Sequence, residues 1–154
     1  MAKHEIETQW MCKMQFNSLI NGHTVIMDAP ERSGGDDYAP IPKPLILAAL
    51  SGCTGMDIIA LLRKENITPH HFEMKVTGTL SKQAPIQYEA IHLTYVFKDA
   101  VLQAAPLVKA VNDSQEKYCG VSSMLKKALP LTWEIVLNNE VVVNNAPELT
   151  AIAG

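Results

Sequence analysis

Residues 45–62 read LILAALSGCTGMDIIALL, a mostly apolar stretch that Pro42 and Pro44 precede. Proline suits the start of a helix, because the first backbone N–H groups there have no partner within the helix. The stretch therefore predicts a helix from about residue 43 to residue 64 that ends before Pro69. Apolar residues occupy nearly its whole circumference, which is typical of a helix buried on all sides.

The length of this stretch is also near the lower limit for spanning ~30 Å of hydrocarbon. However, it contains Asp57 and small polar residues, and no aromatic belt flanks it. We therefore interpret it as the buried helix of a soluble protein. Gly52 and Gly55 lower its helix propensity by roughly 1 kcal/mol each relative to alanine. Such a cost leads us to expect a packed helix or a ligand close to these glycines.

Towards the N-terminus, apolar and polar residues alternate over the first 28 positions, which predicts two or three strands. Asn21-Gly22 separates two of these runs and is a strong signal for a two-residue hairpin turn. Residues 29–42 hold prolines, a glycine pair and charges, and predict a long loop of the kind that can line a site.

Towards the C-terminus, period-two alternation predicts a second hairpin from residues 71–80 and 87–97 and a last strand over 131–137. Between them we expect a helix over 102–111 and a second helix that ends near Lys127. Asp113 and Glu116 have the spacing of a capping box at the start of this second helix. The order of elements predicts an α+β domain.

The whole chain of 154 residues and 16.9 kDa is expected to form one domain, residues 1–154, with a core over about 3–138 and a loosely ordered tail over 139–154. The net charge of −3 does not support nucleic-acid binding. Three cysteines are too few, and odd in number, for a secreted disulfide scaffold. The first residues hold no apolar signal segment, so we expect a cytoplasmic protein.

Cys53 is the main candidate for chemistry, with Asp57 one helical turn beyond it. The alternative is an inert thiol, because free cysteine is among the most buried residue types. Cys119 is a second candidate because it follows Lys117 near a predicted helix start, and both features lower the pKa of a thiol. A place on the buried face of an amphipathic helix would explain Cys119 equally well.

A metal site is the other option that the residue types allow. The chain holds three cysteines and five histidines, but no C-x-x-C or H-x-x-x-H spacing links them. We therefore expect neither a metal nor another cofactor. Cys12 lies in the first predicted hairpin, and we interpret it as a structural or half-exposed thiol.

Two separated segments resemble signatures of the OsmC/Ohr family, the osmotically inducible and organic-hydroperoxide-resistance proteins. Residues 44–57, PLILAALSGCTGMD, are similar to the central-helix signature of the family, and residues 114–121, SQEKYCGV, are similar to its second-cysteine segment. Length and element order agree as well, so the resemblance spans about residues 3–138.

The resemblance implies an OsmC-like fold, with antiparallel sheets around a long buried central helix, in an intertwined homodimer. It also implies a thiol peroxidase for small organic hydroperoxides that a dithiol reductant restores. Cys53 would become a sulfenic acid, which Cys119 would resolve as a disulfide. No nucleic acid or membrane is implied as a partner.

The hydroperoxide-resistance branch of the family activates its thiolate with an arginine and with a glutamate ten residues before the cysteine. Here that glutamate position is Lys43, so the chain is more similar to the broader OsmC-like group. Arg63 is ten residues beyond Cys53, about 15 Å along a helix. Arg32 is then the same-chain arginine candidate, and Lys43 or Lys117 can supply charge without the planar guanidinium contact.

Supporting candidates for the site are therefore five in number: Arg32, Lys43, Asp57, Glu116 and Lys117. Two alternatives to a peroxidase stay open. One is a non-catalytic dimer that binds a small hydrophobic ligand, and the other is a thiol redox sensor. A peroxidase requires a reactive Cys53 with a lowered pKa and a Cys119 sulfur within reach.

Overall fold

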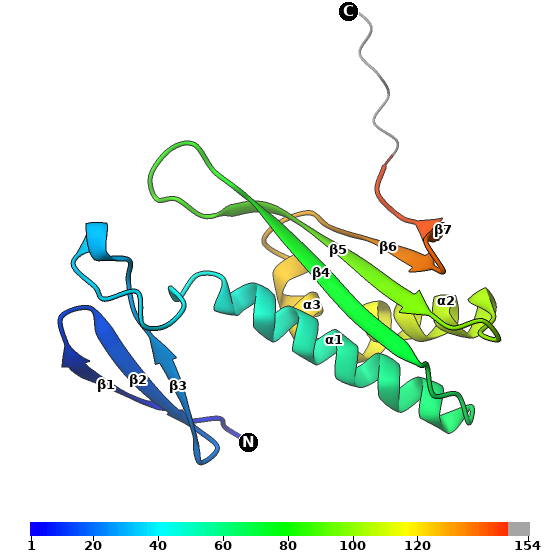
Figure 1. Ribbon diagram of the computed structural model, residues 1–154, viewed down its shortest axis with the longest axis horizontal. Coiled ribbons are helices and arrows are strands. Elements are labelled where there is room, and N and C mark those ends of the chain that lie inside the picture. Colours follow the sequence, from blue (N-terminus) through cyan, green and yellow to red (C-terminus); the bar gives the residue numbers. More distant parts are fainter. Residues whose placement is uncertain (148–154) are drawn as a thin grey trace, which may run out of the picture. The chain divides into compact units, whose positions relative to one another are not determined.

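The computed structural model describes residues 1–147 and divides into two compact units, Met1–Ile46 and the part that starts at Leu47 (Figure 1). Each unit contains its own sheet, with three strands in the first and four in the second. Strands and helices in both parts agree with the predicted α+β class. The single domain expected from the length of the chain thus contains two separately packed parts.

The first unit is an antiparallel meander of β1 (Glu7–Cys12), β2 (Gln15–Ile20) and β3 (His23–Met27). Asn21 and Gly22 between β2 and β3 have φ angles of 50° and 81°. Positive φ at both central residues is the requirement of the hairpin turn that this dipeptide favours. The predicted N-terminal hairpin is confirmed.

The long loop after β3 is organised around the buried side chain of Asp28. Its Oδ2 accepts a hydrogen bond of 3.1 Å from the backbone N–H of Tyr38, and the loop makes one 3₁₀ turn, η1 (Glu31–Ser33). Backbone N–H groups, first that of Ala29, hold the pKa of Asp28 below its usual value. A Cβ at Gly35 would overlap the Ala29 carbonyl, so this position requires glycine. The predicted loop is therefore ordered.

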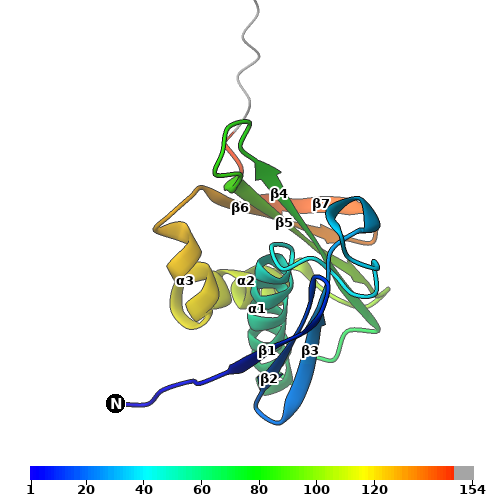
Figure 2. The same cartoon turned by 90° about the vertical axis from the view of Figure 1, so that its left-hand side faces the viewer.

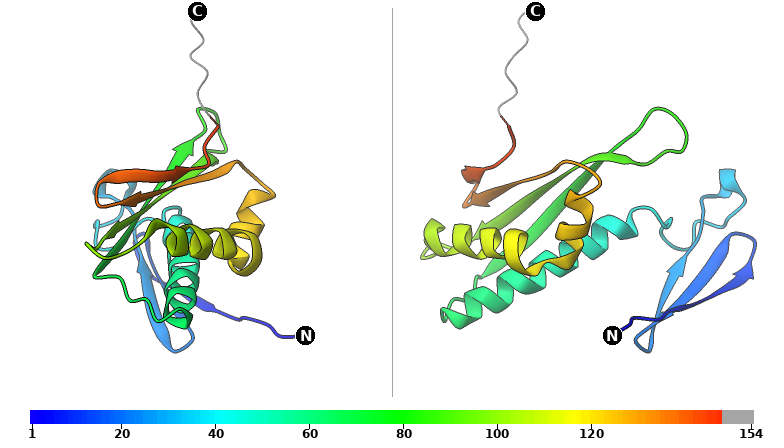
Figure 3. Two further views of the ribbon diagram at one scale, coloured as in Figure 1. Left: turned by 90° about the vertical axis from the view of Figure 1, so that its right-hand side faces the viewer. Right: turned by 180° about the vertical axis from the view of Figure 1, so that it is seen from behind.

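The second unit contains a four-stranded sheet whose strands follow one another in chain order, β4-β5-β6-β7. The long helix α1 and the two shorter helices all cover the same face of this sheet (Figures 2 and 3). The predicted helix and second hairpin are confirmed. The elements are α1 (Leu45–Lys64), β4 (His71–Leu80), β5 (Tyr88–Lys98), β6 (Leu131–Leu137) and β7 (Glu140–Asn144).

Strands β5 and β6 run parallel, which corrects the expectation of wholly antiparallel sheets. Parallel neighbours need a long crossover connection. Here the crossover consists of α2 (Ala104–Asp113), a five-residue π-helical turn η2 (Ser114–Tyr118) and α3 (Gly120–Lys126). The crossover lies on the helical face of the sheet, and it carries the second cysteine.

Two further expectations are wrong. Asp113 has helical backbone angles and caps no helix with its side chain; instead α2 runs on into η2, and α3 starts at Gly120. Residues 140–144, assigned to a loose tail, form the edge strand β7 because they pair with β6. The rest of the expected tail, from residue 148, lies outside the described residues.

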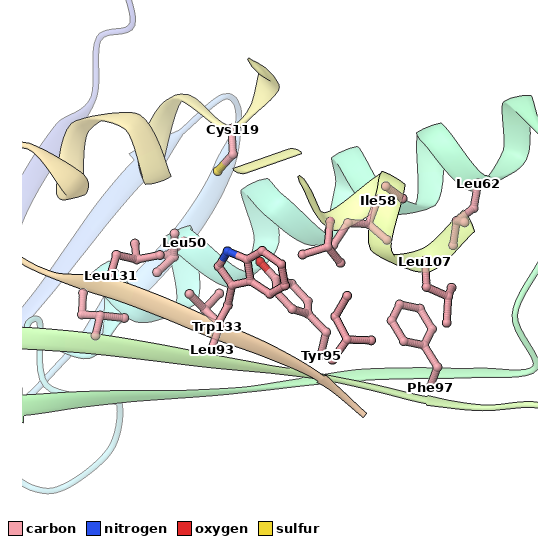
Figure 4. Packing of buried hydrophobic residues seen from close by; sticks show 14 residues of the cluster. Leu50, Ile58, Leu62, Leu93, Tyr95, Phe97, Leu107, Cys119, Leu131 and Trp133 are labelled. Atoms are coloured by element: carbon pink, nitrogen blue, oxygen red, sulfur yellow. The ribbon is translucent and has the colours of Figure 1, made fainter. Parts of the chain in front are cut away.

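The core of the second unit lies between the sheet and its helices (Figure 4). Tyr95, Phe97 and Trp133 project from β5 and β6, and leucine and isoleucine side chains of α1 meet them. Cys119 belongs to this cluster and is 2% exposed. The second cysteine therefore sits at the edge of the main core.

Within the single chain, helix α1 is buried on one face, whereas its apolarity predicts burial on all sides. Five of its 20 residues are buried: Leu50, Thr54, Gly55, Ile58 and Leu62. Met56 on the opposite face is 76% exposed. In length and apolarity α1 also qualifies as a membrane-spanning candidate. Its packing against the core favours the other interpretation, the central helix of a folded unit.

Candidate functional site

Helix α1 places Cys53 and Asp57 on one face, because residues four apart are neighbours on a helix surface. Both side chains are half-buried. Gly55 between them approaches β4 so closely that a Cβ would overlap the Met74 side chain. A close approach is present at this glycine, but it comes from a strand and not from the packed helix or ligand that was expected. A Cβ at Gly52 would meet nothing within 4 Å.

The crossover places Cys119 between η2 and α3. Its backbone N–H donates to the Ser114 carbonyl at 2.8 Å, which closes the η2 turn. Its sulfur accepts a hydrogen bond of 3.3 Å from the Ser122 N–H and so caps α3. Two backbone hydrogen bonds thus determine where the Cys119 side chain points.

These two elements bring Cys53, Asp57 and Cys119 together, although 66 positions separate the cysteines. Their sulfur and carboxylate atoms all lie within 4.8 Å of one another. Both thiols are free. A disulfide needs an S–S distance of about 2.05 Å, so a modest movement of the Cys119 turn can close the gap.

The surroundings of Cys53 raise the pKa of its thiol, opposite to the lowered pKa that a peroxidase requires. Burial is the largest cause, followed by the hydrogen bond to Cys119. The negative charges of Cys119 and Asp57 act in the same direction, and the backbone N–H of Val121 opposes them. Within the second unit, Cys53 is therefore a mostly protonated thiol at neutral pH.

A buried polar network connects α1 to the crossover beneath the thiols. The sequence patterns did not predict it. The Thr54 hydroxyl shares hydrogen bonds with the Tyr95 hydroxyl at 2.9 Å and the Ser114 hydroxyl at 2.8 Å. Ser114 also donates to Asp57 Oδ2 at 3.1 Å. Gln115 Nε2 donates to the Tyr95 hydroxyl at 2.7 Å. The network connects the carboxylate beside Cys53 to the turn that carries Cys119.

Burial raises the pKa of Tyr95 to about 12, although its hydrogen bonds with Thr54 and Gln115 favour ionisation. Tyr95 therefore stays protonated and can serve as a permanent hydrogen-bond donor in the network. The available signal in the sequence was a polar residue near each cysteine: Thr54 directly after Cys53, and Ser114 five residues before Cys119. The residues alone give no indication of which distant strand supplies the tyrosine.

Two of the predicted supporting residues point away from the thiols. The Lys117 ammonium lies 2.7 Å from Asp113 Oδ1, and Glu116 Oε1 lies 2.9 Å from the Lys126 ammonium. Hydrogen bonding to Asp113 raises the pKa of Lys117. Each of these two side chains thus takes part in a different ion pair. Of the supporting candidates in the second unit, Asp57 is the one that lies with the two cysteines.

The other two supporting candidates, Arg32 and Lys43, belong to the Met1–Ile46 unit. Arg32 lies in the turn η1 and is exposed, and Lys43 is half-buried just before α1. Cys12 ends β1 as an exposed free thiol. The expectation of a structural or half-exposed thiol is therefore wrong, because Cys12 is exposed.

A separate apolar groove of about 480 Å³ runs between α1 and β4. Its floor includes Gly52 and Gly55, and Met56, Phe72 and Met74 form its walls. The open space at Gly52 belongs to this groove. The groove is mostly apolar and could hold a partner or ligand.

Comparison with known proteins gives consistent matches. The family model of the OsmC-like proteins matches residues 34–134. Protein YhfA of Escherichia coli (strain K12) is 35% identical over 135 residues, which are 86% of this chain and 98% of that protein.

Solved structures are similar over nearly the whole chain as well. A hypothetical protein from Aquifex aeolicus VF5 has a TM-score of 0.75 at 25% identity and covers 89% of this chain and 98% of its own. The organic hydroperoxide resistance protein OhrB of Bacillus subtilis has a TM-score of 0.59 at 16% identity, with 87% and 98% covered. The latter likeness concerns the fold alone.

Proposed function

Because the chain belongs to the OsmC-like protein family, we propose that it is a thiol-dependent peroxidase for small organic hydroperoxides. One observation carries the proposal: the sulfurs of Cys53 and Cys119 lie within 4.8 Å of each other. Cys53 is the peroxidatic residue because it is half-buried and accessible, whereas Cys119 is buried. The organic hydroperoxide substrate class is carried over from the family resemblance of the two cysteine segments.

The proposed cycle has three balanced steps. The Cys53 thiolate attacks the terminal peroxide oxygen, the O–O bond breaks, and the alkoxide takes up a proton to leave as an alcohol. Cys53 is now a sulfenic acid, and the Cys119 thiol attacks its sulfur to form a disulfide and release water. A dithiol reductant then supplies two electrons and two protons by thiol–disulfide exchange, which restores both thiols.

Because the pKa of Cys53 is raised, a peroxidase needs a positive charge to stabilise the Cys53 thiolate. This charge has to come from a residue other than Asp57 and Cys119. The family resemblance supports Arg32 or Lys43, of this chain or of a second copy, as the source of this charge. A cation beside a thiolate lowers the pKa of the thiol. Without such a cation, reaction with peroxide depends on the small thiolate fraction present at neutral pH.

The proposal includes a homodimer in which α1 buries its second face. Met56 is 76% exposed and borders the groove along α1, and Trp10 in the first unit is 60% exposed. Large exposed apolar surfaces of this kind are typical of interaction sites. Since the proposed cycle requires free thiols and a dithiol reductant, we place the protein in the cytoplasm.

Peroxide consumption tests the proposal. With cumene hydroperoxide and dithiothreitol, we expect Cys53→Ser to abolish turnover and Cys12→Ser to leave it unchanged. In a separate assay without dithiothreitol, Cys119→Ser should still consume one equivalent of peroxide per chain, because it lacks only the resolving thiol. Turnover in Cys53→Ser, or none with any alkyl hydroperoxide in the unmodified protein, would contradict the assignment.

A second candidate is a non-catalytic dimer that binds a small hydrophobic ligand. The apolar groove between α1 and β4 favours it, and so does the raised pKa of Cys53. Thiol alkylation at pH 7 separates the two candidates. If the protein is a dimer and its Cys53 thiol is alkylated no faster than free cysteine, the result supports the binding module. Faster alkylation supports the peroxidase.

A further inference from the structure

The cluster of Cys53, Asp57 and Cys119 has the composition of a binding site for a soft metal ion. Thiolates select Zn²⁺ and similar cations, and a carboxylate can complete the set. All three donor groups lie within 4.8 Å of one another. In a tetrahedral Zn²⁺ site with Zn–S bonds of about 2.3 Å, two sulfurs lie about 3.8 Å apart. A separation of this size lies within the 4.8 Å that bounds the cluster.

Hydrogen bonds already orient each donor. Ser114 donates to one carboxylate oxygen of Asp57, Oδ2, at 3.1 Å. The Ser122 N–H donates to the Cys119 sulfur at 3.3 Å, and the Val121 N–H favours the Cys53 thiolate. Metal ligands in proteins are typically held by such outer partners, and losing one costs 10–100-fold in affinity. The oriented donors distinguish this cluster from a chance encounter of side chains.

The charge balance of the cluster also favours a cation. Two thiolates and a carboxylate within 4.8 Å of one another repel when all three are ionised. The lysines next to Cys119 and in α3 have other partners, since Lys117 pairs with Asp113 and Lys126 with Glu116. A divalent cation would offset the repulsion and keep both thiols deprotonated.

We infer that the reduced protein binds one soft divalent cation of the Zn²⁺ type through Cys53, Cys119 and Asp57. The fourth position is left for water or another small ligand. This set contains no C-x-x-C or H-x-x-x-H spacing, because α1 and the crossover assemble it from residues far apart in the sequence. Binding releases the thiol protons to solvent. A Cys53–Cys119 disulfide removes both thiolates, so metal binding and oxidation exclude each other.

Co²⁺ is the probe for this site, because tetrahedral thiolate coordination gives intense visible ligand-field bands and a sulfur-to-cobalt charge-transfer band. Titration of the reduced full-length protein should reach one Co²⁺ per chain, and one equivalent of Zn²⁺ should abolish the bands. Cys53→Ser and Cys119→Ser should each lose the charge-transfer intensity of one thiolate and bind at least 10-fold more weakly. Ser114→Ala should weaken binding about 10-fold, as the loss of an outer partner does.

Controls separate this inference from the proposed peroxidase. Cys12→Ser should bind as the unmodified protein does, and unmodified protein oxidised to the disulfide should bind nothing, which avoids reliance on the folding of any variant. Full binding in both cysteine variants, or no Co²⁺ bands in the reduced protein, would overturn the inference. Neither readout involves peroxide, so the metal site can stand if peroxidase activity fails, and the converse also holds.

Discussion

Cys53 owes its chemical behaviour to its immediate neighbours. Burial and the adjacent Cys119 raise the pKa of its thiol, and the carboxylate of Asp57 adds to the effect. All three causes lie within the second unit. These three causes alone favour a low thiolate fraction of Cys53 at neutral pH.

At the residue scale, we predict that the rate at which Cys53 reacts with iodoacetamide rises with pH. The midpoint of this rise should lie above the pKa of an ordinary cysteine. The sign follows from the raised pKa, because the reactive thiolate becomes abundant only at higher pH. Rates measured from pH 6 to 10 in the presence of a chelator, with Cys12 replaced by serine, give the midpoint. Asp57→Asn should move the midpoint down, since it removes a negative charge next to the thiol. A midpoint below that of free cysteine would show that another part of the protein supplies a cation.

At the element scale, the polar network holds α1 against the η2 turn. Thr54 is fully buried and bonds both Tyr95 and Ser114, so it bridges helix, strand and crossover. Buried hydroxyls that lose their partners cost more than the net value of the bonds themselves. The network therefore both stabilises the fold and positions Asp57 and Cys119.

We predict that Thr54→Val lowers the free energy of unfolding by about 1–3 kcal/mol, because it keeps the shape of the side chain but leaves two buried hydroxyls short of a partner. Denaturant titration measures the loss. Thr68→Val, at an exposed position, is the matched control and should stay within about 0.5 kcal/mol of the unmodified protein. Equal stabilities for the two variants would mean that the network contributes little.

At the scale of the whole molecule, the exposed face of α1 leaves apolar side chains in contact with water. An 18-residue apolar stretch with one buried face is costly to leave in water at about 25 cal/mol per Å² of apolar surface. The groove beside it is lined mostly by apolar residues, with Ser51 and Arg63 as the polar residues of its lining. A second copy of the chain offers the same apolar face and can cover it.

We therefore predict that Met56→Lys converts the protein to a monomer, because it would bury an unpaired charge in the dimer. Met56 is 76% exposed in the single chain, so the fold of the monomer should tolerate the change. Sedimentation velocity measures the mass, and circular dichroism checks the fold. Val101→Lys, at another exposed apolar position, should stay dimeric. A monomeric unmodified protein would contradict the dimer outright.

Local patterns in the sequence determined most of the elements. The Asn21-Gly22 turn, the helix that occupies 45–64 and the strand over 131–137 depend on periodicity and turn chemistry, which neighbouring residues set. The two cysteine segments also identified the family. The capping box at Asp113 failed because the backbone kept a helical conformation there, which local spacing cannot reveal.

Only the tertiary structure decided how these elements combine. The parallel pairing of β5 with β6, the strand β7 and the single buried face of α1 all depend on contacts between residues far apart in the chain. The site has the same origin: Asp57 meets Ser114, and Cys53 meets Cys119, across about 60 residues. Such contacts depend on packing and on burial, which also raises the pKa of Cys53, and no local period in the sequence encodes them.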